Sequence, residues 1–524
     1  MAGLLSFNSK ELITYLDAHD LHQTWINLLA THIQPLKKFS YILESDEFKG
    51  FEILPKDMLK DLTIGEVGVL YEFSVSHLDS TSRKDKGQYF TPDDVAQFMV
   101  SKISHFPKGK WLDPCSGVGN LSWHLINVQE DKEDFLVNNL ILTDLDELSL
   151  LIARTLFTVN FQDKRKNLFN EIKQNFQVFD FLSVADSTGQ LTTDKTDLQQ
   201  IPAHDYVIVN PPYLAISPAR TEFETAKSRD LYAYFLENII KTSKGFISIT
   251  PQSFTNAEKF TQLRKLLLRK YENLVIYNFD NVPANVFHGI KFGSKNSNTA
   301  NSIRPSVIIA HDGPGKRRIT SLIRWRSSER KTMFDSVDQF LSETELFDEY
   351  FPKVNKVFEA LFKQCSRLKT VDSLIASKKT DHILYVPSTP RYFIPALKTS
   401  VSRQSIKTLY FNNEKDLNRA YLLINSTFAY WWWRVRDGGM TLSMETIKSI
   451  PLLDFPLDDN LVKELEESEK ANKVFKKNAG VEQENVKHPK ELVIKINELV
   501  APAYAEKLIV TAENSELEQL KFLK

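Results

Sequence analysis

The chain has 524 residues, of which 42% are hydrophobic and 25% charged, a composition typical of an ordinary folded protein with two or three domains. Its net charge of −1 excludes a uniformly basic surface, and its two cysteines, Cys115 and Cys365, are too few for a disulfide framework or a metal cluster. We find no signal peptide in the first ten residues and no apolar run long enough to span a bilayer, so we expect a cytoplasmic, reduced protein without a metal.

The N-terminal part of the chain has the pattern of helices. Apolar residues recur at helical spacing over 9–29 and again over 56–75. Further on, Thr91-Pro92-Asp93-Asp94 combines a capping residue, a first-turn proline and two acids, and it predicts the start of a helix over 93–103. We predict a helical segment over 1–82, followed by a loop that can receive an anion at a helix N-terminus.

A strand, a glycine loop and a helix follow in close succession. Trp111-Leu-Asp-Pro-Cys-Ser-Gly-Val-Gly-Asn120 leads into a helix over 121–128, and this is how a nucleotide-binding βαβ unit begins. Gly117 and Gly119 allow the backbone to approach a ligand closely. Asp113 places a negative charge beside that ligand, which disfavours a pyrophosphate and favours a group that carries an ammonium ion.

Two more predicted strands also end in an acid. The strand over 140–144 ends in Asp144, where a carboxylate can accept hydrogen bonds from ribose hydroxyls. The strand over 176–179 is followed by Asp180, which could accept from an adenine amino group, and by Phe181, which could lie against the ring. Each acid alone could be a helix cap, but three acids at successive strand ends indicate a nucleoside-binding site.

Another strand ends in two prolines. The apolar run Tyr206–Val209 is followed by Asn210-Pro-Pro-Tyr213. The prolines remove two backbone donors and fix two φ angles, so the loop is stiff and the strand cannot continue. The loop presents an amide oxygen, a proline carbonyl and an aromatic ring, which suit the binding of an exocyclic amine on a stacked heterocycle.

The remaining pattern completes an open sheet. A helix over 231–241 is followed by strands over 245–250, 274–279 and 306–310, and the loop over 285–291 contains an aromatic residue, Phe287. Strands and helices alternate from 107 to 312. This alternation predicts an α/β fold with a mostly parallel sheet and helices on both faces.

Three motifs together resemble a known family. Gln88-Tyr-Phe-Thr-Pro92, Asp113-Pro-Cys-Ser-Gly-Val-Gly119 and Asn210-Pro-Pro-Tyr213 are similar, in this order, to motifs of the gamma-class DNA N6-adenine methyltransferases of type II restriction-modification systems. The resemblance covers residues 80–310 and continues more loosely over 421–453. It implies a Rossmann-like fold, S-adenosylmethionine as cofactor, and methyl transfer to an adenine that is flipped out of double-stranded DNA.

The resemblance also implies roles for individual residues. Asn210 and Pro211, with Pro212 beside them, would accept hydrogen bonds from the target amine, and Tyr213 would stack on the flipped base with Phe287 as a second aromatic. The other matched positions would bind S-adenosylmethionine: Gln88, Tyr89 and Thr91 at the methionine end, Asp113, Gly117 and Gly119 around the ammonium group, Asp144 at the ribose, and Asp180 and Phe181 at the adenine.

The region after residue 312 contains two basic stretches. Residues 315–331 hold seven lysines and arginines against one glutamate, and residues 363–407 hold nine against two aspartates. We interpret Trp431-Trp-Trp433 as core. The resulting division is a methyltransferase domain over 83–312, a mixed α/β target-recognition domain over 313–455 and a helical segment over 456–524. The candidate DNA contacts are Arg391, Arg403, Lys407, Arg434 and Arg436.

Several readings of the same chemistry remain open at this stage. The chain could recognise its own DNA site, alongside a cognate restriction endonuclease, or it could be the modification subunit of a larger system that needs a specificity subunit. Protein-glutamine methyltransferases share the Asn-Pro-Pro-Tyr loop but are usually shorter, and a binding protein with a degenerate site is disfavoured because every motif is intact. N4-cytosine methylation would need the same hydrogen-bond acceptors for an exocyclic amine. The sequence does not reveal the recognition site or the oligomeric state.

Overall fold

The chain folds into two compact units. The computed structural model describes residues 2–78, 90–183, 200–287, 291–292, 295–296, 303–390, 392–403, 405–439, 441–478 and 481–523. Unit 1 comprises Met1–Phe254, Lys259–Ile276 and Asn285–Lys316, and unit 2 comprises Thr255–Glu258, Tyr277–Ala284 and Arg317–Lys524. Among the described residues, no helix is both long and apolar enough to cross a membrane. The four-part division suggested by the sequence stays a prediction.

The largest sheet has eight strands in the order β10-β6-β9-β5-β4-β1-β2-β3. Its pairs β1–β2, β1–β4, β2–β3 and β4–β5 are parallel, and β5–β9 is antiparallel. This mostly parallel sheet confirms the predicted α/β fold class. The strands are β1 (Trp111–Asp113), β2 (Leu140–Asp144), β3 (Phe176–Val178), β4 (Tyr206–Val209), β5 (Gly245–Pro251), β6 (Asn273–Phe279), β9 (Pro305–His311) and β10 (Arg317–Ile323).

The inner strands of this sheet are short and apolar because both of their faces are covered. Every residue of β1, β2 and β4 is buried, and so are the first six residues of β5. A strand that is buried on both faces gains from continuous apolar residues rather than alternation. Parallel neighbours also end at the same edge of a sheet, so the loops after β1, β2 and β4 start from one edge.

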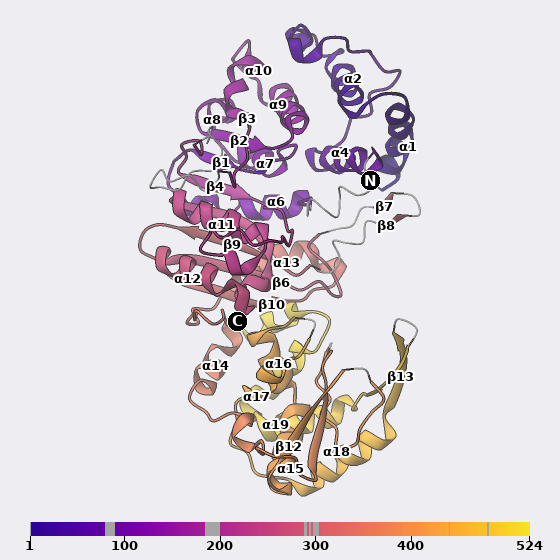
Figure 1. Ribbon diagram of the computed structural model, residues 1–524, viewed down its shortest axis with the longest axis vertical. Helices are drawn as coiled ribbons and strands as arrows, with labels where there is room; N and C mark the ends of the chain where they lie inside the picture. Colours follow the sequence, from indigo (N-terminus) through magenta and orange to yellow (C-terminus); the bar gives the residue numbers. More distant parts are fainter. Residues whose placement is uncertain are drawn as a thin grey trace. The chain divides into compact units, whose positions relative to one another are not determined.

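The helices of unit 1 alternate with these strands after an N-terminal helical segment (Figure 1). They are α1 (Ala2–Ala18), α2 (Leu21–Ile33), α3 (Ser40–Leu43), α4 (Ile64–Leu78), α6 (Asp93–Val100), α7 (Asn120–Asn127), α8 (Lys132–Asn138), α9 (Glu147–Phe161), α10 (Leu168–Glu171), α11 (Leu231–Thr242) and α12 (Thr261–Lys270). A small hairpin, β7 (Lys291–Phe292) with β8 (Lys295–Asn296), completes the described elements of unit 1.

Local capping sets two N-terminal helix boundaries that the apolar spacing did not predict. The helical pattern over 9–29 is two helices, because the Asp20 carboxylate accepts from the Gln23 backbone N–H at 2.7 Å and caps α2. The pattern over 56–75 becomes helical only at Ile64. There Thr63 and Glu66 form a reciprocal capping box, with the Glu66 N–H donating to Thr63 Oγ1 and the Thr63 N–H to Glu66 Oε2.

Unit 2 combines helices with two hairpins. The hairpin β11–β12 is antiparallel, and so is β13–β14, which lies where the sequence predicted only helices. The elements are α13 (Arg330–Ser336), α14 (Glu359–Cys365), β11 (His382–Pro387), β12 (Ile406–Phe411), α15 (Glu414–Asn425), α16 (Thr427–Arg436), α17 (Met444–Lys448), α18 (Asp459–Ala471), β13 (Lys473–Asn478), β14 (Val481–Val486), α19 (Lys490–Val500) and α20 (Ala505–Thr511).

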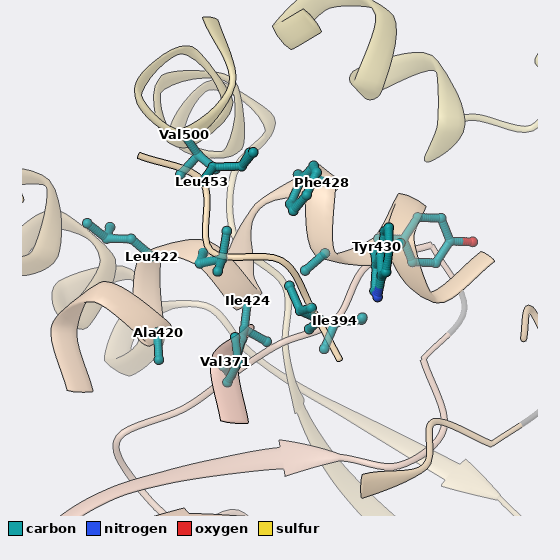
Figure 2. Close-up of a cluster of buried hydrophobic side chains, with 14 of the residues drawn as sticks. Val371, Ile394, Ala420, Leu422, Ile424, Phe428, Tyr430, Leu453 and Val500 are labelled. Atoms are coloured by element: carbon teal, nitrogen blue, oxygen red, sulfur yellow. The ribbon is translucent and has the colours of Figure 1, made fainter. Parts of the chain in front are cut away.

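One hydrophobic core holds much of unit 2 together. Figure 2 shows part of it, with side chains from α15 and α16 packed against Leu453 and Val500. The three tryptophans 431–433 are buried in this core, and Trp432 stacks on Phe362, so their interpretation as core residues is confirmed. Helices α18 and α19 contribute to the same core. The segment after residue 456 therefore packs with the residues before it.

Candidate active site

The functional residues of unit 1 meet at the carboxyl ends of neighbouring strands. Asp113 is the last residue of β1, Asp144 is the last residue of β2, and Asn210 directly follows β4. Because β4, β1 and β2 are adjacent and parallel, these three side chains share one edge of the sheet. This is the edge at which ligands bind in open α/β sheets.

The glycine loop after β1 needs both of its glycines. Gly117 has φ +51° and Gly119 has φ +82°, a left-handed region that other residues rarely occupy. A Cβ on Gly119 would also lie 2.6 Å from the Phe157 ring. The Gly117 backbone N–H donates to Asp144 Oδ2 at 2.8 Å, so the loop is attached directly to the end of the next strand.

Asp113 is a buried carboxyl group with one unused oxygen. Its side chain is 1% exposed, and Oδ2 accepts from the Ser122 hydroxyl at 2.9 Å. Oδ1 has no hydrogen-bond partner among the described residues. Burial, together with the nearby Asp144 carboxylate, raises the pKa of Asp113 to about 7. A buried acid with an unmet acceptor is suited to a cationic ligand, because the ligand would supply the missing donor and the missing counter-charge.

Asp144 is held by the backbone on both sides. Oδ2 accepts from the Gly117 N–H at 2.8 Å and Oδ1 accepts from the Asp146 N–H at 3.0 Å. Each oxygen keeps a lone pair for a further donor. The next side chain, Leu145, is 70% exposed, although it is large and apolar. Sequence reasoning overlooked Leu145; its position directly after a strand-end acid was the available signal.

The Asn210–Tyr213 loop is locked by hydrogen bonds from three segments. Asn210 Nδ2 donates to Thr91 Oγ1 at 2.9 Å, and the Tyr213 hydroxyl lies 2.6 Å from Asn210 Oδ1 and 2.8 Å from the Ile249 carbonyl oxygen. The Cys115 thiol donates to the Asn210 carbonyl oxygen at 3.2 Å. No described residue donates to the carbonyl oxygen of Pro211. The loop therefore offers a fixed amide oxygen beside an available proline carbonyl.

Aromatic rings surround Tyr213. Tyr232 meets it edge to face, with ring centroids 6.3 Å apart, and Phe287 lies at the same distance with its plane inclined by 63°. Phe287 is almost fully buried. Its ring is covered by protein in this conformation, so it supports Tyr213 from the side and does not present a free face for a second stacking contact.

The two predicted adenine contacts differ in how they are placed: Asp180 is exposed and its role stays a prediction, whereas Phe181 is buried. Phe181 is 1% exposed and stacks on Phe235, with centroids 5.3 Å apart, so its ring has no free face for a ligand. Asp180 is exposed and accepts from the Leu182 N–H at 3.0 Å and from the Ser183 hydroxyl, which is the behaviour of a local cap. The prediction that Phe181 lies against the adenine is therefore wrong for this conformation, because its ring belongs to the core.

The loop before α6 is only partly described. Gln88 and Tyr89 lie outside the described residues, whereas Thr91 is buried and accepts from Asn210 as given above. The Thr91 carbonyl oxygen accepts from Asn120 Nδ2 at 2.7 Å, which joins this loop to the first turn after the glycine loop. Asn120 was not singled out from the sequence. Its place at a helix N-terminus, immediately after Gly119, was the signal.

The candidate DNA contacts in unit 2 differ in their exposure and in the contacts that their side chains make. Arg391 lies outside the described residues. Arg403 is half-buried, donates to Thr389 Oγ1 at 2.8 Å and also bonds to Asn485, and Lys407 is half-buried on β12. Arg436 places its guanidinium 3.8 Å from the centroid of the Tyr350 ring. These residues stay proposals as DNA contacts.

Arg434 is a structural residue. Its side chain is 7% exposed, and its guanidinium pairs with Asp280 at 2.8 Å and with Glu516 at 3.0 Å. Arg324, in the first basic stretch, is also buried and pairs with Asp280 at 3.3 Å. Two arginines and two acids thus neutralise one another inside unit 2. We therefore withdraw Arg434 as a candidate DNA contact, because a buried and paired guanidinium cannot reach a phosphate or a base.

Comparisons with known proteins place the chain near restriction-modification methyltransferases. Residues 138–287 match the family model described as Eco57I restriction-modification methylase, a segment that includes Asp144, the Asn210–Tyr213 loop and Phe287. The chain is also 25% identical over 213 residues to the Type II methyltransferase M.PstI of Providencia stuartii, and 26% identical over 239 residues to the Type II methyltransferase M.BanIII of Aneurinibacillus aneurinilyticus. These matches confirm the resemblance to restriction-modification methyltransferases that the three motifs indicate.

The matches are partial. They cover 38% and 41% of this chain, and in both cases the chain spans 40% of the length of the relative. Among solved structures, the cryo-EM structure of a DrdV–DNA complex aligns with a TM-score of 0.44 at 14% identity, over 74% of this chain and 49% of that one.

Proposed function

We propose that this chain is an S-adenosylmethionine-dependent DNA methyltransferase of a restriction-modification system, and that it methylates N6 of an adenine flipped out of double-stranded DNA. The observation that carries the proposal is the fixed Asn210–Tyr213 loop at the end of β4, beside the strand that ends in Asp113. This loop offers two acceptors and a ring, and Asp113 offers an unpartnered carboxylate oxygen for a cation. A methyl transfer between an amine and a sulfonium cofactor requires both.

The residues present fit S-adenosylmethionine. The unpartnered Asp113 Oδ1 would accept from the ammonium group of its methionine end, and the left-handed glycines give that end room to approach the backbone. Asp144 retains acceptor capacity for the ribose hydroxyls, and the exposed Leu145 side chain provides an apolar face for the adenine. When bound, the cofactor supplies a methyl group that is already activated as a sulfonium.

The chain's own residues would raise the reactivity of the target amine. The N6 lone pair of adenine is delocalised into the ring, so this amine is a weak nucleophile. Accepting its two hydrogens at Asn210 Oδ1 and the Pro211 carbonyl favours an sp³ nitrogen as the new bond forms. Thr91 and the Tyr213 hydroxyl hold the amide in the required orientation beforehand, so little reorganisation is left for the reaction itself. The proton then leaves to solvent.

Flipping the base would give the amine access to the cofactor. Inside a duplex the N6 group cannot reach a second molecule in a protein pocket, and an extruded base needs an aromatic surface on which to stack. Tyr213 would provide that surface, with Tyr232 and Phe287 holding its ring from the sides. N4-cytosine methylation would use the same acceptors, and adenine is favoured by the resemblance of the motif order.

Replacing Asp113 with asparagine should stabilise the ligand-free protein above pH 7 and abolish S-adenosylmethionine binding. Folding raises the pKa of Asp113 from 3.8 to about 7, so the folded state holds a proton that the unfolded state releases between these values. Stability from this group is therefore lost as the pH rises from about 4 to about 7, and a neutral amide avoids that loss. Thermal unfolding and equilibrium dialysis against labelled cofactor measure the two effects.

At pH 8 the Asp113→Asn variant should melt about 5 °C above the wild type, and near pH 4 the two should melt together. Ser122→Ala is the matched control, because it removes the donor to Oδ2 but keeps the charge. Retained cofactor binding by Asp113→Asn would contradict the assignment of Asp113 to the ammonium group.

The proposed function is tested by sequencing DNA from a methylation-free host that expresses this chain alone. Single-molecule sequencing should find N6-methyladenine at one short sequence, and the Asn210→Ala control should leave the DNA unmodified. If the sequencing found modified cytosine at one sequence, the target would be cytosine and not adenine. Unmodified DNA, in spite of a folded protein that binds S-adenosylmethionine, would favour the alternative of a modification subunit that needs a specificity partner, or a substrate other than DNA.

A further inference from the structure

Helix α4 of the N-terminal segment packs closely on the loops of the candidate cofactor pocket. Gly65 and Gly68 are three residues apart and so lie on one side of this helix. A Cβ on Gly68 would come within 2.7 Å of the Phe90 ring and 3.1 Å of Val118, and a Cβ on Gly65 would come within 2.5 Å of the Asp93 carboxylate. The backbone of α4 therefore lies close to Phe90 and Asp93 and to Val118 of the glycine loop; Figure 1 shows α4 beside α7.

Side-chain hydrogen bonds at Asp93 also hold the start of α4 against α6. Thr63, which caps the helix, donates from its hydroxyl to Asp93 Oδ2 at 2.7 Å. The other oxygen of Asp93 lies 3.1 Å from the His124 ring nitrogen, on the helix that follows the glycine loop. Asp93 thus connects α4 to the pocket through two different side chains.

One turn further along the helix, Tyr71 contacts Asp146, which lies two residues after β2 and caps α9. Its hydroxyl donates to Asp146 Oδ2 at 2.5 Å, and its ring packs edge to face on Trp25 with centroids 5.2 Å apart. Burial and the Asp146 carboxylate raise the pKa of Tyr71 well above its ordinary value, so the hydroxyl remains a donor throughout the physiological pH range. Tyr71 itself is buried.

Asp146 connects Tyr71 to Asp144, through its side chain on one side and its backbone N–H on the other. The second oxygen of Asp146, Oδ1, accepts from the Leu148 and Ser149 N–H groups and caps α9, so its carboxylate is held from two sides. The Asp146 backbone N–H in turn donates to Asp144 Oδ1, while Gly117 donates to Asp144 Oδ2. A continuous chain of hydrogen bonds therefore runs from Tyr71 through Asp146 to Asp144 and the glycine loop.

We propose that helix α4 is an integral part of the cofactor site, and that Tyr71 is a positioning residue that orients Asp144 for the ribose hydroxyls by holding Asp146. This inference rests on the proposed function, because it assigns Tyr71 to the binding of S-adenosylmethionine. The binding energy gained at Asp144 depends on how firmly its carboxylate is oriented before the ligand arrives. Loss of the Tyr71 hydroxyl should loosen that orientation without removing any group that touches the ligand.

The test is the affinity of the full chain for S-adenosylmethionine, measured by isothermal titration calorimetry without DNA. Tyr71→Phe keeps the ring on Trp25 and removes only the hydroxyl, and we expect it to weaken binding about tenfold. Tyr41→Phe is the matched control. It removes a tyrosine hydroxyl from the same N-terminal segment, where it donates to Gln162 Oε1 at 2.6 Å, outside the Asp146–Asp144 chain. We expect its affinity to equal that of the wild type.

Hydrogen exchange on the wild-type chain gives a second readout that needs no variant. Adding S-adenosylmethionine should slow amide exchange in α4 together with residues 113–120 and 144–149. Unchanged affinity in Tyr71→Phe, an equal loss in Tyr41→Phe, or unchanged exchange in α4 would each overturn the assignment of Tyr71 while leaving the proposed function intact. A wild-type chain that binds no S-adenosylmethionine would overturn the proposed function as well.

Discussion

Asn210→Ala should lower the rate of methyl transfer by about a thousandfold or more, with the affinity for S-adenosylmethionine changed by less than about threefold. The variant removes the fixed amide oxygen that is the proposed acceptor for the target amine, and it also removes the bonds to Thr91 and to the Tyr213 hydroxyl. These interactions orient the proposed amine acceptor, whereas the hydrogen bonds that hold Asp113 and Asp144, the proposed cofactor ligands, are untouched. The loss should therefore fall on the chemical step.

Single-turnover transfer of labelled methyl groups to DNA measures the rate, and calorimetry measures cofactor affinity. Tyr213→Phe separates two roles of the loop, because it keeps the ring and removes only the hydroxyl at Asn210 Oδ1. It should retain more activity than Asn210→Ala or Tyr213→Ala. Asn175→Ala is a matched control in the same unit, since its side chain donates to the Leu136 and Val137 carbonyl oxygens. Activity in Asn210→Ala above a tenth of the wild-type rate would rule out its proposed catalytic role.

Arg434→Ala should destabilise unit 2 by about 3–5 kcal/mol, the usual cost of removing one partner from a buried ion pair. The variant leaves Asp280 and Glu516 buried with only Arg324 to balance them. Burial already raises the pKa of Glu516, and removing Arg434 takes away a neighbouring positive charge. Since that carboxyl can take up a proton at low pH, the loss of stability should be smaller at pH 5 than at pH 8.

Urea unfolding at the two pH values, followed by tryptophan fluorescence, measures this effect, because the three tryptophans 431–433 lie in the core of unit 2. Arg436→Ala is the matched control. It removes an arginine from the last turn of the same helix, where the side chain packs on Tyr350 outside the buried cluster, and should cost less than about 1 kcal/mol. Equal losses in both variants would contradict the structural role of Arg434.

Much of the sheet and part of the site follow from local sequence patterns. The apolar run Tyr206–Val209 and the prolines after it place β4 and its loop at their observed bounds, and Leu140–Asp144 is likewise found as predicted. Such signals lie within a few residues, because burial selects apolar side chains and proline ends a strand without any distant partner. The capping box at Thr63 is equally local.

Which side chains of different elements contact one another could be seen only in the tertiary structure. Asn210 is oriented by Thr91, 119 positions earlier, and Arg434 is paired with Asp280, 154 positions earlier, so a residue that resembled a DNA contact is an internal ion-pair partner. Phe181 packs in the core on Phe235, and Tyr71 of the helical segment donates to Asp146, 75 positions later. Local patterns predicted seven of the eight strands of the largest sheet and the chemical character of the strand ends, but not β10 or the two hairpins of unit 2. Partners far apart in the chain are selected by packing and charge neutralisation between elements, which no local pattern records.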